Sequence, residues 1–476
     1  MRVLQRTALL LLVLTSSAWA KGDALGAAAA RYVRDAHGVL PSSGSWAIPR
    51  PERLALRLVP SFARQTGMAC HMCHYQFPQL TPFGRQFKLN GYTLSGMKPI
   101  EDKTKEGKAV LQLQPYPPVS LMLQASATQL ATALPGTQNF TVAMPQQLGV
   151  LFAGAIGSNV GAFTQVTWSP GGGTFEIDNV DIRYADRTEW GGKPVVWGLT
   201  LNNSPSAQDL WNTTPTWGYP FASSGVAPSP MGETMVAGGL AQRSVGLGAY
   251  AMWNDLLYAE LSAYRTSVPG AASPLDSSAR GTLSGFTPYW RLALQRQFGD
   301  QYLMIGTFGL SAKLFPAGVT GPTDDFTDIA FDAQHEMPVG DGHLVSRLAW
   351  ISESQTLASS FGAGASANRT NTLNTLRLSS SWYPSHTWGL TASVFSTSGT
   401  ADTLVYAPGS VSGSANGKPQ SNGASIEASY NLWENARLSM TYTMFGTYNG
   451  GTSNYDGSGR SASANNSLYV LWWFAF

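Results

Sequence analysis

The alternation of apolar and polar residues constrains the fold of this chain most. In residues 425–432 every even position is apolar and every odd position is polar, and residues 437–444 repeat the pattern after a tight turn at 434–435. Such alternation is typical of β-strands with one apolar and one polar face. A membrane barrel with a water-filled lumen is built from such strands, but a soluble β-sandwich also contains them.

The spacing of turns distinguishes these two folds. Short turns are expected at 157–159, 188–193, 254–255, 299–300, 340–342, 385–386 and 434–435. Longer segments rich in Gly, Ser, Asn and Pro lie at 131–146, 205–242, 268–285, 313–325, 355–371, 398–422 and 447–466, and only 169–174 is brief. With a first strand near 118–130 and a last strand at 467–476, these turns give about sixteen strands, and bacterial barrels have even numbers.

Turn length also predicts the orientation of such a barrel. Short turns belong on the periplasmic side, together with both ends of the barrel segment, and long loops belong outside. We therefore expect loop 205–242, with its Trp211, Trp217 and Tyr219, to face outward. Lumen-facing charges are expected at Asp181, Arg183, Glu427 and Arg437.

The C-terminal stretch supports a closed barrel. Residues 468–476 are almost wholly apolar and end on Phe476, which resembles the terminal strand that outer-membrane assembly machinery recognises. Left unpaired in a soluble protein, this strand would be an aggregation hazard, and closure against the first strand removes the free edge. The sequence therefore predicts an all-β outer-membrane barrel of antiparallel strands over residues 111–476.

Composition fits this class of fold. Charged residues make up only 12% of the chain, and no segment after the N-terminus approaches the run of about 20 apolar residues that a spanning helix needs. The formal net charge of +2 gives no reason to expect a nucleic-acid partner.

The N-terminus has the pattern of a secretory signal peptide. Arg2 and Arg6 precede a short apolar run at 8–14, and Ala18-Trp19-Ala20 fits the small-x-small cleavage rule. We expect residues 1–20 to be removed, so that the mature chain starts at Lys21 outside the cytoplasm.

The two cysteines of the chain lie in one short window, Cys70-His71-Met72-Cys73-His74. Cys-x-x-Cys-His is the attachment signature of c-type haem, in which two thiols bind the haem and the adjacent histidine binds its iron. We therefore expect one covalent haem c on Cys70 and Cys73, with His74 as the proximal iron ligand. A disulfide is the first alternative in an exported protein. A redox-active dithiol would need a βαβ context, and a zinc site would need further soft ligands.

The sixth iron ligand is less defined by the sequence. Met97 follows an aromatic-rich stretch after His74, and a thioether in that position would raise the reduction potential. Met97 is the candidate distal ligand, with an apolar contact as the alternative. His37 is a remote candidate. The other histidines, His335, His343 and His386, fall on expected strands or turns and are interpreted as solvated.

Several motifs resemble the fused outer-membrane cytochrome–porins of iron-oxidising bacteria. The resemblance covers Pro60 to Cys70, Phe77-Pro78, 83–88 and Gly91-Tyr92-Thr93 closely. It covers 178–181, 201–205, 208–212 and 217–220 more loosely. It implies a single haem c in a small N-terminal domain, here residues 21–110, which is small enough to plug part of the lumen. It also implies a porin-like barrel and oxidation of extracellular Fe(II).

The resemblance leads to an expected function in electron transfer. Electrons from an extracellular donor, Fe(II) or another reductant, would pass through the haem to a periplasmic carrier such as a soluble cytochrome or a copper protein. Such a protein is an electron-transfer protein or Fe(II) oxidase rather than a hydrolytic or transferase enzyme. The alternative is a solute porin whose cytochrome domain acts as a gate or sensor. A haem enzyme such as a peroxidase would need a vacant sixth site and a distal acid or base.

Overall fold

The structure, a computed structural model, describes residues 60–94, 100–105, 107, 109–113, 117–171, 173–267, 282–316 and 320–476. The predicted signal peptide, His37 and Met97 lie outside these residues. Among the described segments, no helix has both the length and the apolar character needed to cross a membrane.

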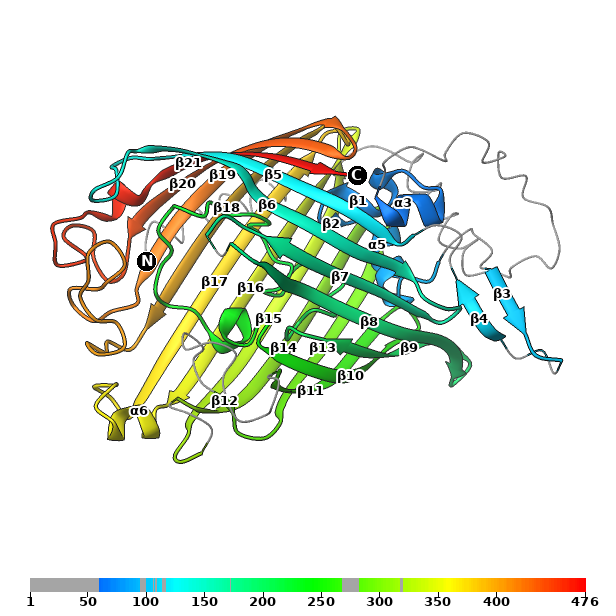
Figure 1. Cartoon of the computed structure of the whole chain (residues 1–476), viewed down its shortest axis with the longest axis horizontal. Coiled ribbons are helices and arrows are strands. Elements are labelled where there is room, and N and C mark those ends of the chain that lie inside the picture. Colours follow the sequence, from blue (N-terminus) through cyan, green and yellow to red (C-terminus); the bar gives the residue numbers. More distant parts are fainter. Residues whose placement is uncertain are drawn as a thin grey trace. The chain divides into compact units, whose positions relative to one another are not determined.

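Antiparallel strands form a closed barrel (Figure 1). The two-residue strand β12 pairs with β14, as does β13, so β12 and β13 share one place and the described barrel has sixteen strand positions. The barrel elements are β5 (Val119–Leu130), β6 (Phe140–Ala155), β7 (Val160–Trp168), β8 (Phe175–Trp190), β9 (Lys193–Asn202), β10 (Ser244–Trp253), β11 (Leu257–Thr266), β12 (Thr282–Leu283), β13 (Thr287–Phe298), β14 (Gln301–Phe315), β15 (Asp324–Val339), β16 (Gly342–Thr356), β17 (Thr370–Tyr383), β18 (Trp388–Gly399), β19 (Ser421–Trp433), β20 (Ala436–Thr447) and β21 (Ser467–Ala475). The predicted strand number and closed architecture are confirmed.

Strand pairing follows the alternation in the sequence. Ile426 of β19 lies opposite Tyr442 of β20, and both are exposed on the outer surface. Their neighbours Glu427 and Thr441 face the lumen, where the threonine hydroxyl donates a hydrogen bond to the glutamate (3.0 Å). β21 closes the barrel by pairing with β5, as expected for the apolar C-terminal strand.

Short turns gather at one end of the barrel. All seven predicted short turns connect consecutive strands there, from the β6–β7 turn to the β19–β20 turn. Asn254 and Asp255 show why the sequence marks these turns, since both adopt positive φ (54° and 51°), which Asn and Asp tolerate better than most residues.

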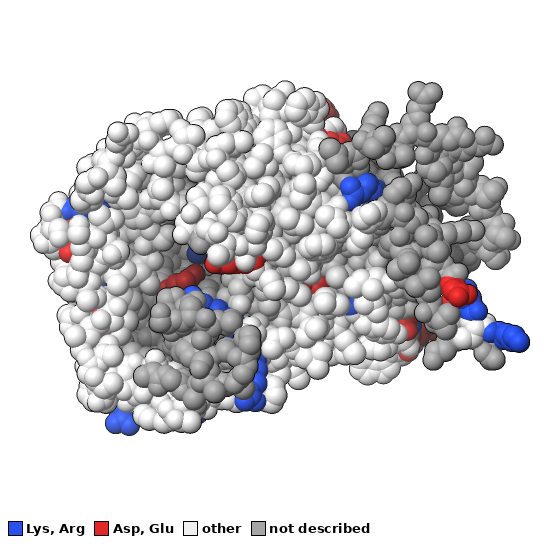
Figure 2. Space-filling model, viewed as in Figure 1, with Lys and Arg blue, Asp and Glu red and all other residues white. Residues whose placement is uncertain are grey.

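The outer surface carries aromatic residues near both ends, and the residues between them are apolar, mostly aliphatic with some aromatics such as Phe331. Exposed aromatics near the short turns are Trp190, Phe298, Trp388 and Trp433, and those near the long loops are Phe140, Phe175 and Phe286. On the face shown in Figure 2, most of the strand surface lacks Lys, Arg, Asp and Glu. Membrane barrels have this arrangement of an apolar band between aromatic girdles.

One long loop differs from its prediction. The loop between β9 and β10 was expected to face outward, but much of it is buried in the lumen, including residues 204–214 and the π-helix η1 (Met235–Gly239). Trp211 is 1% exposed, and its indole nitrogen donates a hydrogen bond to Tyr302 (2.6 Å) on β14. The outward prediction is therefore wrong for Trp211. It is also wrong for Tyr219, which is 6% exposed, and for Trp217, whose ring lies against Lys88 inside the lumen. The lumen of such a barrel is wide enough to admit a long loop, and the loop buries apolar surface of the lumen wall when it folds inward.

The two sides of the lumen have different side chains. β10 to β14 present what we call the aromatic wall: Tyr250, Tyr258, Tyr264, Tyr289 and Phe308, all fully buried. β17 to β20 and β5 present what we call the hydroxyl wall: Ser381, Thr391, Ser425, Ser429, Ser439 and Thr128. The inward part of the β9–β10 loop packs against the aromatic wall.

An N-terminal segment, residues 60–94, fills the short-turn end of the lumen, and we call it the plug (Figure 1). Its elements are α3 (Ser61–Thr66), α4 (Cys70–Cys73), β1 (His74–Gln76), β2 (Gln79–Leu80) and α5 (Pro82–Leu89). A separate hairpin, β3 (Ile100–Lys103) and β4 (Ala109–Leu113), follows it in the chain. The remaining described helices, α6 (Ala358–Gly362) and η2 (Ala462–Asn465), lie in the long loops.

Candidate functional site

The Cys-x-x-Cys-His motif lies at the junction of a helical turn and a short strand. α4 runs from Cys70 to Cys73, so the two thiols are three residues apart on neighbouring positions of one helical face. Both cysteines are half-buried and free. Thr81 holds the end of α4, since its hydroxyl donates to the Met72 carbonyl (2.6 Å) and its amide donates to the Cys73 carbonyl (2.9 Å).

Local sequence explains this packing. Thr81 is the N-cap of α5, accepting from the Gly84 amide (3.2 Å), and Pro82 occupies the first helical position. A Cβ on Gly84 would lie 2.1 Å from the Cys73 carbonyl oxygen, so only glycine lets α5 approach α4 this closely. The residues after the motif therefore fix its position.

Both thiols are held in their protonated form. Burial raises the pKa of Cys73 to about 11, with a further contribution from nearby Cys70. Burial, followed by the charge of Glu434, raises the pKa of Cys70. A redox-active dithiol has a lowered pKa that makes it a nucleophile, so this environment argues against that alternative.

His74 is neutral and has an unused nitrogen. Burial lowers its pKa to about 4, although the backbone carbonyls of Pro78 and Gln79 act in the opposite direction. Its Nδ1 is buried and has no hydrogen-bond partner among the described residues. A neutral imidazole is the form that binds metals, so His74 fits the role of an iron ligand.

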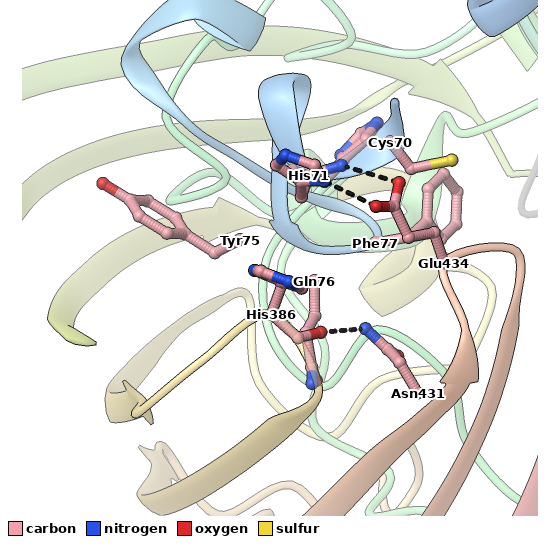
Figure 3. A pocket seen from close by; sticks show the side chains of 9 residues that line it. Cys70, His71, Tyr75, Gln76, Phe77, His386, Asn431 and Glu434 are labelled. Atoms are coloured by element: carbon pink, nitrogen blue, oxygen red, sulfur yellow. Dashed lines mark hydrogen bonds and ion pairs between the residues drawn. The ribbon is translucent and has the colours of Figure 1, made fainter. Parts of the chain in front are cut away.

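A small cleft, with a cavity volume of about 10 Å³, opens beside the motif (Figure 3). It is lined by Cys70, His71, His74, Tyr75, Gln76, Phe77, His386, Asn431 and Glu434. Nδ1 of His71 and Oε1 of Glu434 are 2.6 Å apart, and the His71 ring stacks on His386 at 4.9 Å. Ligand pockets commonly measure about 300–1,000 Å³. The cleft is far smaller, so a haem attached to the motif would lie mostly outside it.

The barrel holds the plug through a buried ion pair on β15. Arg85 forms a close ion pair with Glu336, and both side chains are nearly inaccessible. Tyr75, directly after His74, donates its hydroxyl to the same carboxylate (3.0 Å). Glu336 raises the pKa of Arg85 despite its burial, which keeps this residue charged.

A second buried ion pair holds the end of the plug on β8. Arg183 and Asp181 are 2.9 Å apart, and Arg183 also donates to the Lys88 carbonyl (3.2 Å). The Tyr92 hydroxyl donates to Asp181 (2.6 Å). A Cβ on Gly161 of β7 would lie 2.1 Å from the Gly91 carbonyl oxygen, so a glycine is needed where the plug meets the strand.

Contacts on the other side of the plug are mainly neutral. Ser429 of β19 donates to Oε1 of Gln76 (2.5 Å), and Arg437 of β20 donates to the Phe77 carbonyl (2.5 Å). The Phe77 ring stacks on Trp473 of β21 with ring centres 4.4 Å apart. The plug is thus fixed to strands on opposite sides of the barrel.

Inside the lumen, the plug meets the inward β9–β10 loop. Nζ of Lys88 donates to the Asp209 carbonyl (2.7 Å) and lies 4.4 Å from the centre of the Trp217 ring. The Leu80 amide donates to Oδ1 of Asn212 (3.1 Å). Burial, followed by the charge of Arg183, lowers the pKa of Lys88 to about 7.

The structure brings together most of the predicted lumen residues. Asp181, Arg183 and Arg437 contact the plug, as described above. His386 was interpreted as solvated, and it is exposed but also lines the cleft beside the motif. His343 is exposed too, and its ring packs on Tyr75 at 5.3 Å.

Sequence reasoning missed Glu336, Glu434, Lys88 and Asp209. Each acts across a long separation in the chain, so no local pattern signals its role. The described residues contain no group of three or more His, Cys, Asp and Glu side chains placed to hold a metal ion.

No protein-family model matches the chain, and no curated protein matches it either. The chain is similar in structure to the outer membrane channel DcaP of Acinetobacter baumannii, with 13% identity and a TM-score of 0.44, covering 79% of this chain and 99% of that one. It is also similar to an anion-selective porin from Comamonas acidovorans (12% identity, TM-score 0.43, covering 75% and 98%). OmpT, an outer membrane protein of Vibrio cholerae, gives 11% identity and a TM-score of 0.41, covering 75% and 96%.

Proposed function

We propose that this protein is an outer-membrane cytochrome–porin that carries electrons from an extracellular donor, Fe(II) being the one favoured, to periplasmic carriers. One observation carries the proposal: a haem-attachment motif with a neutral, half-buried histidine belongs to a plug fixed in the short-turn end of a closed barrel. The apolar outer band and its aromatic girdles support placement in the outer-membrane lipid.

In this proposal each residue of the motif has a distinct role. Cys70 and Cys73 attach one haem c covalently, and His74 is the proximal ligand of its iron. Met97 remains the candidate distal ligand and lies outside the described residues. When bound, haem c supplies a one-electron carrier. The raised pKa values of the two thiols disfavour exchange with other thiols.

The filled lumen supports electron transfer rather than solute transport. Plug and inward loop touch at Lys88 and Asp209, so protein bridges the lumen along the aromatic wall. An extracellular donor would then exchange electrons with the haem without itself crossing the barrel. The carrier on the periplasmic side, a soluble cytochrome or a copper protein, would meet the cleft at the short turns.

The second candidate function is a solute porin with a regulatory or gating cytochrome domain. It is favoured by the hydroxyl wall, where Arg377 is exposed and Glu427, Thr441 and Thr443 are only half-buried within the lumen. Small hydroxyl side chains leave room for water along this side. The two functions therefore differ in which half of the lumen is used.

A spectroscopic redox titration of the purified full-length protein tests the proposal. Fe(II) is added as the reductant, and the reduced haem bands are followed. The proposal expects one covalent haem per chain, reduced by Fe(II). A protein that carries haem but is not reduced by Fe(II), while conducting solutes through planar bilayers, would support the gated porin instead.

A further inference from the structure

Arg347 of β16 is a buried cation whose hydrogen-bonding capacity is largely unused. Its side chain faces the lumen, and the residue is 4% exposed. Nη2 donates to the Ser381 hydroxyl of β17 (3.1 Å), but Nε and Nη1 are buried and have no hydrogen-bond partner among the described residues. The described carboxylates form ion pairs with Arg85, Arg183 and Arg291, but none does so with Arg347. A guanidinium cannot lose its proton in a protein, so this charge is buried without compensation.

The hydroxyl wall fixes the direction of this guanidinium. Ser381 and Thr391 lie opposite each other in the β17–β18 pairing, and the Thr391 hydroxyl donates to the Ser381 oxygen (2.9 Å). The same oxygen accepts from Nη2 of Arg347. Because a guanidinium is planar and its donors point in fixed directions, anchoring Nη2 also determines where Nε and Nη1 point.

The inward β9–β10 loop covers the guanidinium with aromatic side chains. The centre of the Phe221 ring lies 5.1 Å from Cζ of Arg347, and the Tyr219 ring packs edge-on against Phe221 with ring centres 5.5 Å apart. The Tyr219 hydroxyl is buried, and it too has no hydrogen-bond partner in the part of the chain that the structure describes. Unpaired donors from the barrel and from the loop therefore adjoin one aromatic ring.

The acidic residues that act on this guanidinium are engaged elsewhere. Two of them, Glu336 and Asp209, influence it electrostatically. Glu336 is paired with Arg85 of the plug, and Asp209 is paired with Arg291. Neither carboxylate is within ion-pair distance of the guanidinium, so the chain supplies the cation and its donors but no anion to match them.

We propose that Arg347 and the Tyr219 hydroxyl bind a small oxyanion, a carboxylate or inorganic phosphate, between the hydroxyl wall and the inward loop. Negatively charged oxygens accept from both N–H and O–H groups, and hydrogen bonds of this kind are strengthened by charge. The anion also neutralises the buried cation. It joins the barrel to the loop, so its binding favours the inward position of the loop, whether the protein carries electrons or solutes.

Equilibrium dialysis of the full-length protein in detergent micelles tests the site. Radiolabelled inorganic phosphate and, separately, radiolabelled acetate are dialysed against the protein in a chloride buffer. We expect saturable binding of one anion per chain. Saturation by phosphate alone assigns a phosphate site, and saturation by acetate alone assigns a carboxylate site. Absence of saturable binding for both probes would overturn the proposal, because water would then satisfy the unpaired donors.

Variants separate the site from general attraction of anions to the lumen. Arg347→Met removes the cation and should abolish the binding. Tyr219→Phe removes only the hydroxyl and should weaken the affinity about tenfold, as expected for a hydrogen bond to a charged group. The matched control is Arg377→Met, which removes an exposed arginine from the lumen side of β17 and should leave the binding unchanged. Equal binding by Arg347→Met and the wild type would overturn the proposal.

Hydrogen exchange gives a second readout that does not depend on the dialysis. The bound anion should slow exchange of the Phe221 amide in the wild type and in Arg377→Met, but not in Arg347→Met. Exchange that slows equally in all three proteins would show that the anion acts elsewhere, which contradicts the site. Heat-modifiable migration verifies that each variant has a folded barrel.

Discussion

The aromatic and hydroxyl walls hold the plug by different means. On the side of the aromatic wall, buried ion pairs at Glu336 and Asp181 fix the plug, and the inward loop covers the wall. On the hydroxyl wall the plug is held by neutral groups, such as Ser429 with Gln76, and by the Arg437 contact to a carbonyl. Removing one partner of a buried ion pair leaves an uncompensated charge and costs much free energy, whereas removing one neutral hydrogen bond costs little.

This difference suggests that the two sides of the lumen have different roles. The aromatic wall, plug and inward loop form a continuous packed body that positions the motif. The strands of the hydroxyl wall also carry Arg377, which is exposed, and Glu427 and Thr441, which are half-buried within the lumen. A barrel whose two halves differ in this way can hold a cofactor firmly on one side without filling the other.

The largest expected effect is the loss of covalent haem, which depends on the motif in the plug and not on either wall. Cys70→Ala with Cys73→Ala should abolish covalent haem completely, because no other cysteine exists in the chain. Barrel folding should be retained, since the closed ladder of the barrel runs through β5 to β21 and does not include α4. Haem-stained denaturing gels and heat-modifiable migration report the two properties together. Covalent haem in the double variant would refute the attachment assignment.

The second-largest effect is expected when one partner of a buried ion pair is removed, which should weaken the docking of the plug. Arg85→Met leaves the Glu336 carboxylate buried without its cation, which costs about 3–5 kcal/mol. Hydrogen exchange of plug amides should rise accordingly. The double variant Arg85→Met with Glu336→Leu should recover much of the loss, because no charge stays buried. Equal exchange in the single variant and the wild type would show that the pair does not anchor the plug.

Plug docking should also depend on pH through Lys88. Its pKa falls from 10.5 to about 7 on burial, so the docked plug binds fewer protons than a released plug between these values. Docking therefore strengthens as pH rises through this window, by up to about 1.4 kcal/mol per pH unit. Exchange of the α5 amides, corrected for intrinsic rates, measures this slope.

Lys88→Met removes that titration, together with the cation over the Trp217 ring, and should flatten the slope. A slope that persists in Lys88→Met would assign the pH dependence to another group.

The smallest effect is expected on the hydroxyl wall. Ser429→Ala removes one neutral hydrogen bond to Gln76, worth about 1 kcal/mol. Exchange in β1 should increase only slightly, and the haem spectrum should not change. A loss as large as that of Arg85→Met would mean that the two walls anchor the plug equally.

Much of the barrel could be predicted because its signals are local. Period-two alternation gives the strands, and Gly, Asn and Asp mark the short turns, as at Asn254-Asp255. The motif Cys70-x-x-Cys73-His74 is equally local. The inward course of the β9–β10 loop could not be predicted, because its length and composition are also those of an outward loop. Only packing against the aromatic wall decides between them.

The contacts between the plug and the barrel could not be predicted from the sequence for a related reason. Glu336 is one of many alternating polar residues on a strand, and its pairing with Arg85 spans 251 positions in the chain. Alternation shows that such a residue faces the lumen, but not what it meets there. The sequence therefore predicts which strand residues face the lumen better than it predicts their contacts with the plug and the inward loop.

The most direct test of the account uses intact cells that carry the full-length protein. Fe(II) and, separately, a reductant too large to pass a porin lumen are added outside, and haem reduction is followed by absorbance. The account predicts prompt reduction by both donors without lysis, because the packed plug and loop connect the haem with the outer face. Failure of both donors in intact cells, with reduction after lysis, would contradict it and favour the gated porin.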